Sequence, residues 1–505
     1  MTAKLPPTKL VVFPVGPRSQ SDLILAKELD YSPMPSPGPT SAGCTHANLQ
    51  LEPSAYAEEA GFAQQPPVKR FAAATKSGRN LLLNERSGRD GTEARAAQEA
   101  DAQLATFPGP LVLPWDDLGW EPEAEGQSFK SWHQEKARNK PTTARSTLYV
   151  VDVPEITPEV QQMRQWSLPK QEIAKRGISK STGSDPAFAT TPTPHAEDFV
   201  EYLATFYHGF SVKSFPQRLR FVAWEEKAKK FRRVLQQQHV GLATADGNTT
   251  RIRARPSQDG IFDGQLNLED ILDAAIAMLP RDAYAIVLLM DHDLYEDEKD
   301  DFCCGRAYGG SRVSVVSMSR YRPELDDSWG IDLAHMWPAS HCQRYVAHLC
   351  AEQDIHNETR KVPAAATSPM RAAVRAASQT SQSNSSEYLK GLWFSRVART
   401  VAHELGHCLC LDHCIYYACL MQSTSGIAED VRQPPYLCPV CMSKISYKVA
   451  VELRRGSEDD RISYVRERYQ ALAGVCERWK HIGMFAGYQA WLEERLRGLN
   501  EAADS

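Results

Sequence analysis

The feature that most constrains this chain is the run HELGHCLCLDH, which begins at His403 and ends at His413. On a helix, His403 and His407 are one turn apart and project from the same face, so both rings can reach one metal ion. His413 offers a third imidazole after a turn, and Glu404 lies beside the site as a candidate general base. The spacing predicts an open three-histidine zinc site in which zinc-activated water attacks a substrate.

A second group of metal-ligating residues follows immediately. A Cys-x4-Cys pair is followed at a distance by a Cys-x2-Cys pair, a pattern that suits a closed four-thiolate zinc site. The ligands expected there are Cys414, Cys419, Cys438 and Cys441. Because His413 and Cys414 are adjacent in the sequence, we predict two zinc ions per chain, side by side, one catalytic and one structural.

Charge and hydropathy argue against several classes of partner. The formal net charge is -5 over 505 residues and no long basic block occurs, so nucleic acid is not an expected partner. The first residues carry prolines where a secretory signal needs an uninterrupted apolar core. The apolar run from Ala283 to Met290 is too short to span a bilayer. We therefore expect a cytoplasmic or nuclear protein without a membrane partner, whose oligomeric state the sequence leaves open.

Cysteine usage supports a reducing compartment. Many of the twelve cysteines crowd around the histidines at metal-ligand spacing rather than in a pattern typical of exported, disulfide-linked domains. Cys408 and Cys410 could be extra ligands, but helix packing for Cys408 and a turn role for Cys410 are the favoured interpretations. The remaining cysteines are expected to be free thiols: Cys44, Cys303, Cys304, Cys342, Cys350 and Cys476.

The chain divides by composition into three parts. Residues 1–145 are rich in proline, alanine and charge, and we expect a largely disordered N-terminal arm. Residues 146–450 are predicted to form the catalytic domain, with an insertion around residues 325–388. Residues 451–505 carry an amphipathic pattern typical of a helical C-terminal extension.

Hydrophobic periodicity predicts an α+β fold. Dense apolar runs at Ser146–Val153 and Ala283–Met290 indicate buried strands, and residues 195–207 and 266–278 have helical spacing. The paired glycines Gly309 and Gly310 separate two short β-like runs, which we expect to form an antiparallel pair. Strands that alternate with helices are typical of an α+β or α/β core.

The segment before the histidine motif is predicted to change from loop to helix. Residues 364–386 are rich in alanine and serine and are expected to form a loop, after which Asn384 and Glu387 can cap the next helix. On that helix an apolar stripe is expected to face the core while His403 and His407 emerge on another face. The stripe consists of Phe394, Val397, Val401, Leu405 and Leu409.

These motifs resemble those of the archaemetzincins, a family of metzincin-type zinc metallopeptidases. The resemblance rests on HELGHCLCLDHC, Met421, and CPVC followed by MSKI from Cys438 onward. Upstream, Asp293–Tyr295 and a set of single residues are similar to the strand pair that precedes the family's active-site helix. Those residues are Gly305, Ala307, Gly310, Arg312, Val316, Ser317 and Arg320. The resemblance covers the chain from about Ala283 to Lys448.

The resemblance implies a metzincin-like zinc peptidase fold with a mixed twisted sheet, an active-site helix, a Met-turn and C-terminal helices. It implies catalytic zinc on His403, His407 and His413, with Glu404 as base and Met421 beneath the metal. It also implies a structural zinc on the four cysteines and aminopeptidase-like activity on small peptides. One departure is Cys410, where metzincins have glycine; a left-handed conformation there would cost about 1 kcal/mol or more. Another is Gln422-Ser423 after the methionine: astacin-like relatives carry a tyrosine two residues after the methionine, and this chain does not, so no tyrosine ligand is expected.

Two other functions compete with a peptidase. A non-catalytic, zinc-stabilised interaction protein would use both metal groups only to hold the fold, but it would have no use for Glu404. A cysteine-type zinc ribbon that binds nucleic acid is disfavoured because the chain lacks a basic face. The segment Asp291–Asp293 could suggest another metal site, but we interpret it as a solvated loop after a strong strand.

Overall fold

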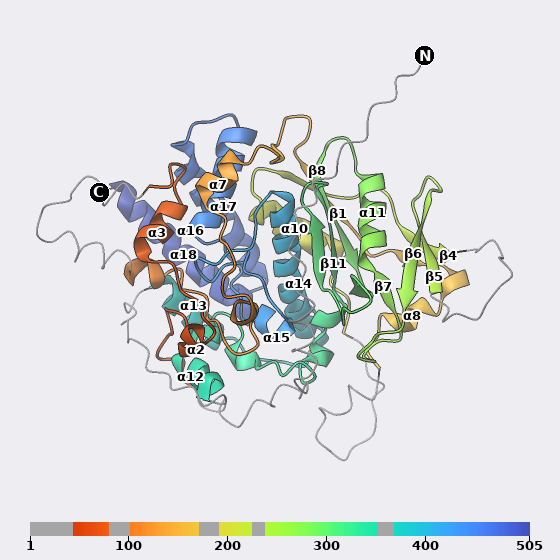
Figure 1. The fold of residues 1–505 in the computed structure, drawn as a ribbon, viewed down its shortest axis with the longest axis horizontal. Helices are drawn as coiled ribbons and strands as arrows, with labels where there is room; N and C mark the ends of the chain where they lie inside the picture. The colour runs from red at the N-terminus through yellow and green to blue at the C-terminus, as the bar shows by residue number, and fades with distance from the viewer. Residues whose placement is uncertain (1–43, 80–100, 171–190, 225–237, 352–367, 505) are drawn as a thin grey trace, which may run out of the picture.

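The computed structural model describes residues 44–79, 101–170, 191–224, 238–351 and 368–504, which form two β-sheets flanked by helices (Figure 1). The first sheet has the strand order β10-β11-β8-β1-β3. Within it β3, β1, β8 and β11 are parallel, and β10 runs antiparallel to β11. The strands are β1 (Thr147–Val151), β3 (Ser211–Ser214), β8 (Ala283–Met290), β10 (Gly305–Tyr308) and β11 (Val313–Ser317). This mixed sheet confirms the predicted α+β class and the antiparallel pair at Gly309-Gly310.

The central strands are buried on both faces, as their continuous apolar sequences predict. In β1, Leu148 and Val150 belong to one hydrophobic cluster while Tyr149 and Val151 belong to another. All residues of β8 are buried. Helices α10 (Ala196–Phe206) and α14 (Ser386–Cys408) pack on one face of this sheet, and α11 (Leu268–Met278) packs on the other. The side chain of Asn267 caps α11 by accepting from the backbone N–H of Asp270.

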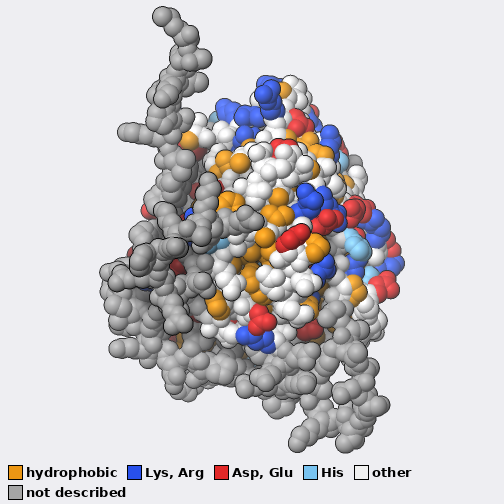
Figure 2. All heavy atoms as spheres, turned by 90° about the vertical axis from the view of Figure 1, so that its right-hand side faces the viewer, with side chains coloured by type: hydrophobic (Ala, Val, Ile, Leu, Met, Phe, Trp, Pro, Cys, Tyr) orange, Lys and Arg blue, Asp and Glu red, His pale blue; other side chains and the backbone are white. Residues whose placement is uncertain are grey.

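A second sheet lies beyond α11 and was not predicted from the sequence (Figure 1). Its order is β2-β4-β5-β6-β7-β9. The strands are β2 (Glu155–Ile156), β4 (Arg220–Ala223), β5 (Gln238–Ala243), β6 (Thr249–Arg255), β7 (Gln265–Asn267) and β9 (Asp293–Tyr295). Most of these strands are short and partly exposed, so they lack the apolar runs from which β1 and β8 were predicted. On the face seen in Figure 2, acidic and basic side chains are interspersed among small apolar groups.

Helices form the other half of the molecule (Figure 1). Helix α17 (Asp460–Arg478) packs against α10 and α18 (Gly483–Asp504), and α18 also packs against α13 (Pro369–Ser378). Among the described residues the other α-helices are α2 (Ala55–Glu59), α3 (Pro67–Ala73), α6 (Asp117–Trp120), α7 (Phe129–Gln134), α8 (Met163–Trp166), α12 (Gln343–Ala351), α15 (Ile427–Asp430) and α16 (Pro439–Ser446). A π-helical turn, η6 (Tyr447–Leu453), follows α16. Among the described residues no helix is long and apolar enough to cross a bilayer.

Helix α13 corrects the predicted loop over residues 364–386. Ser368 caps this helix by accepting from the backbone N–H of Arg371, and Pro369 occupies its first position. Met370, Ala373 and Val374 are buried against the core. The alanine- and serine-rich composition concealed the helix, because such a composition is typical of loops and linkers. The N-cap of α14 is Ser385 rather than Asn384.

The N-terminal region is folded over much of its length, in contrast to the predicted disordered arm of residues 1–145. Leu51, Phe129 and Trp132 are buried in the main hydrophobic cluster. These anchors are widely separated in the sequence, so they give no periodic signal, and their burial comes from surfaces that other elements supply. Residues 1–43 and 80–100 lie outside the described residues. The division into arm, catalytic domain and C-terminal extension stays a prediction.

Candidate metal centres

Helix α14 presents the histidine pair because its opposite side is buried. Val397, Val401 and Leu405 belong to the main hydrophobic cluster, and the helix packs on β8, β10 and β11. His403 and His407 are only half-buried and lie on the face that the apolar stripe leaves free. The predicted stripe is therefore confirmed, and it fixes the direction in which the two imidazoles point.

The structure brings the three predicted histidines together. The Nε2 atoms of His403 and His407 are 3.0 Å apart. The ring of His413 lies 5.5 Å from that of His403 and 4.9 Å from that of His407, centroid to centroid. One nitrogen from each ring lies within 4.8 Å of the other two. Such convergence of three imidazoles is the arrangement that an open zinc site requires.

In two of these three rings, a backbone carbonyl determines which nitrogen is free to bind a metal. His403 Nδ1 lies 2.7 Å from the carbonyl oxygen of Leu420, and His407 Nδ1 lies 2.7 Å from that of Leu411. A carbonyl can only accept, so each Nδ1 carries the proton and each Nε2 keeps a lone pair for a metal. Burial lowers the pKa of His407 well below its ordinary value, and the neighbouring His403 and His413 lower it further. Burial also lowers the pKa of His413 to about 3. Neutral imidazoles of this kind fit a zinc ion.

Glu404 is buried beside the histidine group, next to strand β10. Burial raises its pKa to about 8, while the charge of Arg306 acts in the opposite direction. Gly305 makes this arrangement possible, because a Cβ at that position would lie 3.0 Å from Glu404 Oε1. Gly309 permits a second close approach, since a Cβ there would lie 2.6 Å from the carbonyl oxygen of His407. Strand β10 can thus lie directly against the helix that carries the candidate base.

The turn after α14 contains Cys410, at the position where metzincins have glycine, and it adopts the conformation expected there. Cys410 has φ of +66°, which confirms the left-handed conformation. Its N–H donates to the carbonyl of His407, and the N–H of Leu411 donates to that of Gly406. This pair of bonds is the Schellman arrangement that ends many helices. Gln127 Nε2 donates to the carbonyl of Cys410 at 3.1 Å, so the turn is also held from outside.

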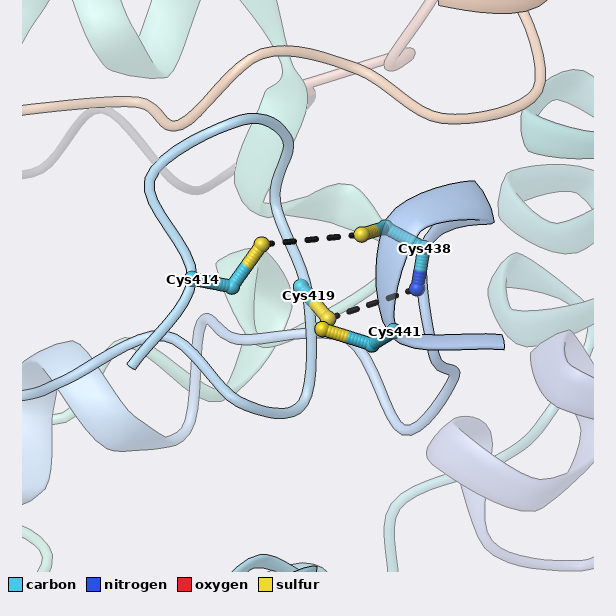
Figure 3. Close-up of side chains that lie close together, drawn as sticks. All are labelled: Cys414, Cys419, Cys438 and Cys441. Atoms are coloured by element: carbon cyan, nitrogen blue, oxygen red, sulfur yellow. Dashed lines mark hydrogen bonds between the residues drawn. The ribbon is translucent and has the colours of Figure 1, made fainter. Parts of the chain in front are cut away.

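The four predicted cysteines form a fully buried group (Figure 3). Cys414 and Cys419 lie on the loop after α14, while Cys438 and Cys441 lie at the start of α16, and all four sulfur atoms point toward one another. The sulfur atoms of Cys414 and Cys438 are 3.5 Å apart, and the N–H of Cys438 donates to Cys419 Sγ at 3.3 Å. Hydrogen bonds from the other three thiols hold the pKa of Cys414 well below its ordinary value. This donor set fits a closed four-thiolate zinc site.

Met421 lies under the histidine helix. Its carbonyl accepts from the N–H of Cys414 at 2.8 Å, which joins the two ends of the cysteine loop. A Cβ on Gly406 would lie 2.5 Å from Met421 Sδ, so glycine is needed for the methionine to approach the helix. The loop therefore connects the third histidine, the first two cysteines and the methionine.

Comparisons with known proteins find relatives that match the region containing these residues. The family model described as Peptidase family M54 matches residues 371–447, which contain all seven candidate ligands. Archaemetzincin-2 of Pongo abelii is 27% identical over 374 residues, covering 72% of this chain and 77% of that protein. The chain is thus similar to the archaemetzincins, most specifically in the region that carries the candidate ligands.

Other relatives match over shorter regions. Archaemetzincin-2 of Macaca fascicularis is 27% identical over 215 residues, covering 43% of this chain and 46% of that protein, so the match spans about half of the relative's length. The crystal structure of archaemetzincin from Methanopyrus kandleri is 16% identical, with a TM-score of 0.28, and covers 61% of this chain and 98% of that one.

The structure confirms one expectation about other residues near the site and contradicts another. Cys408 is buried in the main cluster, which confirms its packing role. The segment Asp291–Asp293 is not a solvated loop, so that interpretation was wrong. Asp293 is fully buried in an ion pair with Arg320, and His292 Nε2 lies 3.0 Å from the carbonyl of Met163. The strong strand β8 leads into β9 of the second sheet, which covers these side chains.

Sequence reasoning missed the residues of the N-terminal region that support the metal loop. Gln127 contacts Cys410 and also Lys444 on α16, whose Nζ lies 2.7 Å from Gln127 Oε1. Trp132 Nε1 donates to the carbonyl of Leu409. No sequence signal could identify these residues, because they lie more than 270 positions before the atoms they contact. A third group of potential ligands, which contains Cys44, His46 and His335, was also missed.

Proposed function

We propose that this chain is an archaemetzincin-type zinc metallopeptidase that hydrolyses peptide bonds. The observation that carries the proposal is the convergence of three imidazoles with Glu404 beside them. A site that only held the fold would need no carboxylate at that point. We propose a catalytic zinc on His403, His407 and His413 and a structural zinc on the four cysteines.

Glu404 is assigned the role of general base. When bound by the three histidines, zinc would polarise the scissile carbonyl and make water more acidic. Glu404 would accept the proton of the attacking water and transfer it to the leaving amine. Its carboxylate is buried against Gly305, so it is shielded from bulk solvent while it holds that proton.

Strand β10 is the proposed position for the substrate backbone. It is the last strand of the first sheet, so one of its sides is not paired within that sheet. An extended peptide can add to such an edge through main-chain hydrogen bonds. Gly305 on β10 lies next to Glu404, which would bring a peptide bond close to the base. We propose aminopeptidase-like hydrolysis of small peptides by this route.

The finer structural assignment is a metzincin-like fold in which Met421 forms the Met-turn. Its position against Gly406, one residue before His407, supports this role. The cysteine zinc would then hold the loop that carries both His413 and Met421. We also propose a cytoplasmic or nuclear location, supported by cysteines grouped at metal-ligand spacing, which suit a reducing compartment.

The decisive experiment measures peptide hydrolysis by the full chain before chelation, after mild chelation, and after zinc is restored. Loss and recovery of activity are expected, because an open histidine site releases zinc more readily than a closed thiolate site. Peptides with a free N-terminus should be cleaved faster than the same peptides with an acetylated N-terminus. A zinc-loaded chain that cleaves neither set would favour the non-catalytic, zinc-stabilised interaction protein.

A further inference from the structure

A third group of metal-ligating side chains lies outside both sites described above. One ligand atom from each of Cys44, His46 and His335 lies within 4.8 Å of the other two. Cys342 adds a second sulfur, since its Sγ lies 3.4 Å from that of Cys44. The four side chains come from two segments almost 300 positions apart, so their approach is a product of the fold. Together they offer two sulfur and two imidazole donors.

The imidazole nitrogens of this group are oriented as a metal would require. His335 is 3% exposed, and its Nε2 is buried without a hydrogen-bond partner in the described structure. The Nε2 of His46 is in the same state. A buried, unpaired nitrogen is costly, so two of them in a group that also contains two thiols call for a missing partner.

A carboxylate and an aromatic ring fix the orientation of His335. Its Nδ1 lies 2.7 Å from Asp332 Oδ2, which leaves Nε2 as the free ligand atom. Asp332 is itself held, because Oδ1 accepts from the N–H of Ala334. The ring of Tyr345 stacks on the imidazole at 4.3 Å with an interplanar angle of 4°. A carboxylate on the second nitrogen is the usual support of a metal-bound histidine.

The backbone around Cys342 holds the two segments together. The N–H of Gln343 donates to the carbonyl of Asn48, and the N–H of Gln50 donates to that of His341. Cys342 also directly precedes α12, and a helix N-terminus favours the thiolate form of a cysteine. Nearby, Tyr56 of α2 packs against the hydrophobic cluster that contains Val346 and Cys350 of α12, and Figure 1 shows the two helices close together. The potential ligands are therefore held in place by ordinary packing on both segments.

We propose that Cys44, His46, His335 and Cys342 bind a third zinc ion, which clips the N-terminal segment to the region before α12. Two thiolates and two imidazoles in a closed group are a donor set typical of structural zinc. Asp332 is occupied by His335, so no carboxylate remains free to act as Glu404 does. The site therefore stabilises the fold and takes no part in peptide hydrolysis.

The test is an elemental zinc count on the full-length chain, purified without chelator. Three zinc ions per chain are expected in the wild type and two in Cys44→Ser. Cys350→Ser is the matched control, because Cys350 is a buried thiol of the same region outside every metal group, and it should retain three. Cys44→Ser should also melt at a lower temperature while its peptide hydrolysis changes less than twofold.

The count separates this proposal from the peptidase proposal. A His403→Ala, His407→Ala double variant should lose one zinc and all hydrolysis, whether or not the third site exists. A wild-type count of two, with one zinc lost in that double variant and an unchanged count in Cys44→Ser, would overturn the third site. If Cys44→Ser does not fold, zinc is replaced by cobalt in Cys342→Ser and in the wild type, and the absorption spectra of the two chains are compared. Because the four-thiolate site keeps its own absorption, a decrease in thiolate-to-cobalt absorption relative to the wild type supports the third site, and an unchanged spectrum overturns it.

Discussion

The histidine group and the cysteine group share one loop, yet they differ in their access to solvent. The three imidazoles are half-buried, whereas the four thiols are fully buried. Two of the imidazoles are oriented by backbone carbonyls and keep one nitrogen free, while the thiols contact one another. The difference indicates an open site that can admit water and substrate beside a closed site that can only hold the fold. Adjacent residues, His413 and Cys414, thus serve different purposes.

The largest effect should come from removing the base while keeping the metal. We expect Glu404→Gln to retain the zinc content of the wild type, because Glu404 is not a ligand, and to reduce hydrolysis about 100-fold or more. Zinc analysis and steady-state rates on one preparation measure both quantities. Glu296→Gln is the control, since Glu296 pairs with Arg306 near the site and should affect the rate only modestly. Wild-type hydrolysis by Glu404→Gln would show that another group is the base.

The next effect tests whether the closed site supports the open one. Cys441→Ser removes a thiolate from the cysteine group without touching a histidine, so the loop from Cys414 to Met421 should lose its anchor. We expect a loss of about 4 kcal/mol or more in stability together with weaker binding of the catalytic zinc. Thermal melting and zinc titration are the measurements. Cys476→Ser, at a buried thiol outside the metal groups, should keep its zinc. Equal behaviour of the two variants would mean that the cysteines hold no structural ion.

A smaller effect should come from the N-terminal region, which supports both sites through Gln127. This side chain bonds to the carbonyl of Cys410 beside the open site and to Lys444 on the helix of the closed site. We expect Gln127→Ala to lower stability by about 1–2 kcal/mol, because buried polar partners are left unsatisfied. Denaturant unfolding and zinc affinity can measure the change. Gln134→Ala, at an exposed position of α7, is the matched control and should be neutral. A neutral Gln127→Ala would show that other N-terminal contacts, such as that of Trp132 with Leu409, provide the support.

How much the sequence could predict depends on whether the residues of a feature lie close together in the chain or are brought together only by the fold. Ligands close together in the sequence, such as His403 and His407, were predictable because helix geometry alone places them on one face. The strands β1 and β8 were predictable because burial on both faces requires an unbroken apolar run. Cys44 and Cys342 gave no such signal, since only the folded chain brings them together. The strands β4 to β6 were missed because they are short and partly exposed, and α13 was missed because its alanine- and serine-rich composition is typical of a loop although its buried residues recur at helical spacing.

The smallest effect concerns the turn between the two sites, where Cys410 occupies a left-handed conformation. Glycine has no Cβ and adopts this conformation freely, so Cys410→Gly should relieve strain, although it also makes the unfolded chain more flexible. We expect a net gain of about 0.5–1 kcal/mol in the free energy of unfolding. Cys410→Ala is the matched control, because it removes the thiol but keeps the Cβ and should give no gain. Denaturant unfolding of the zinc-loaded chains measures the difference. Equal stability of the glycine and alanine variants would show that the bonds from Gln127 and the Schellman arrangement already absorb the strain, and that the loop is held by its contacts rather than by its backbone preference.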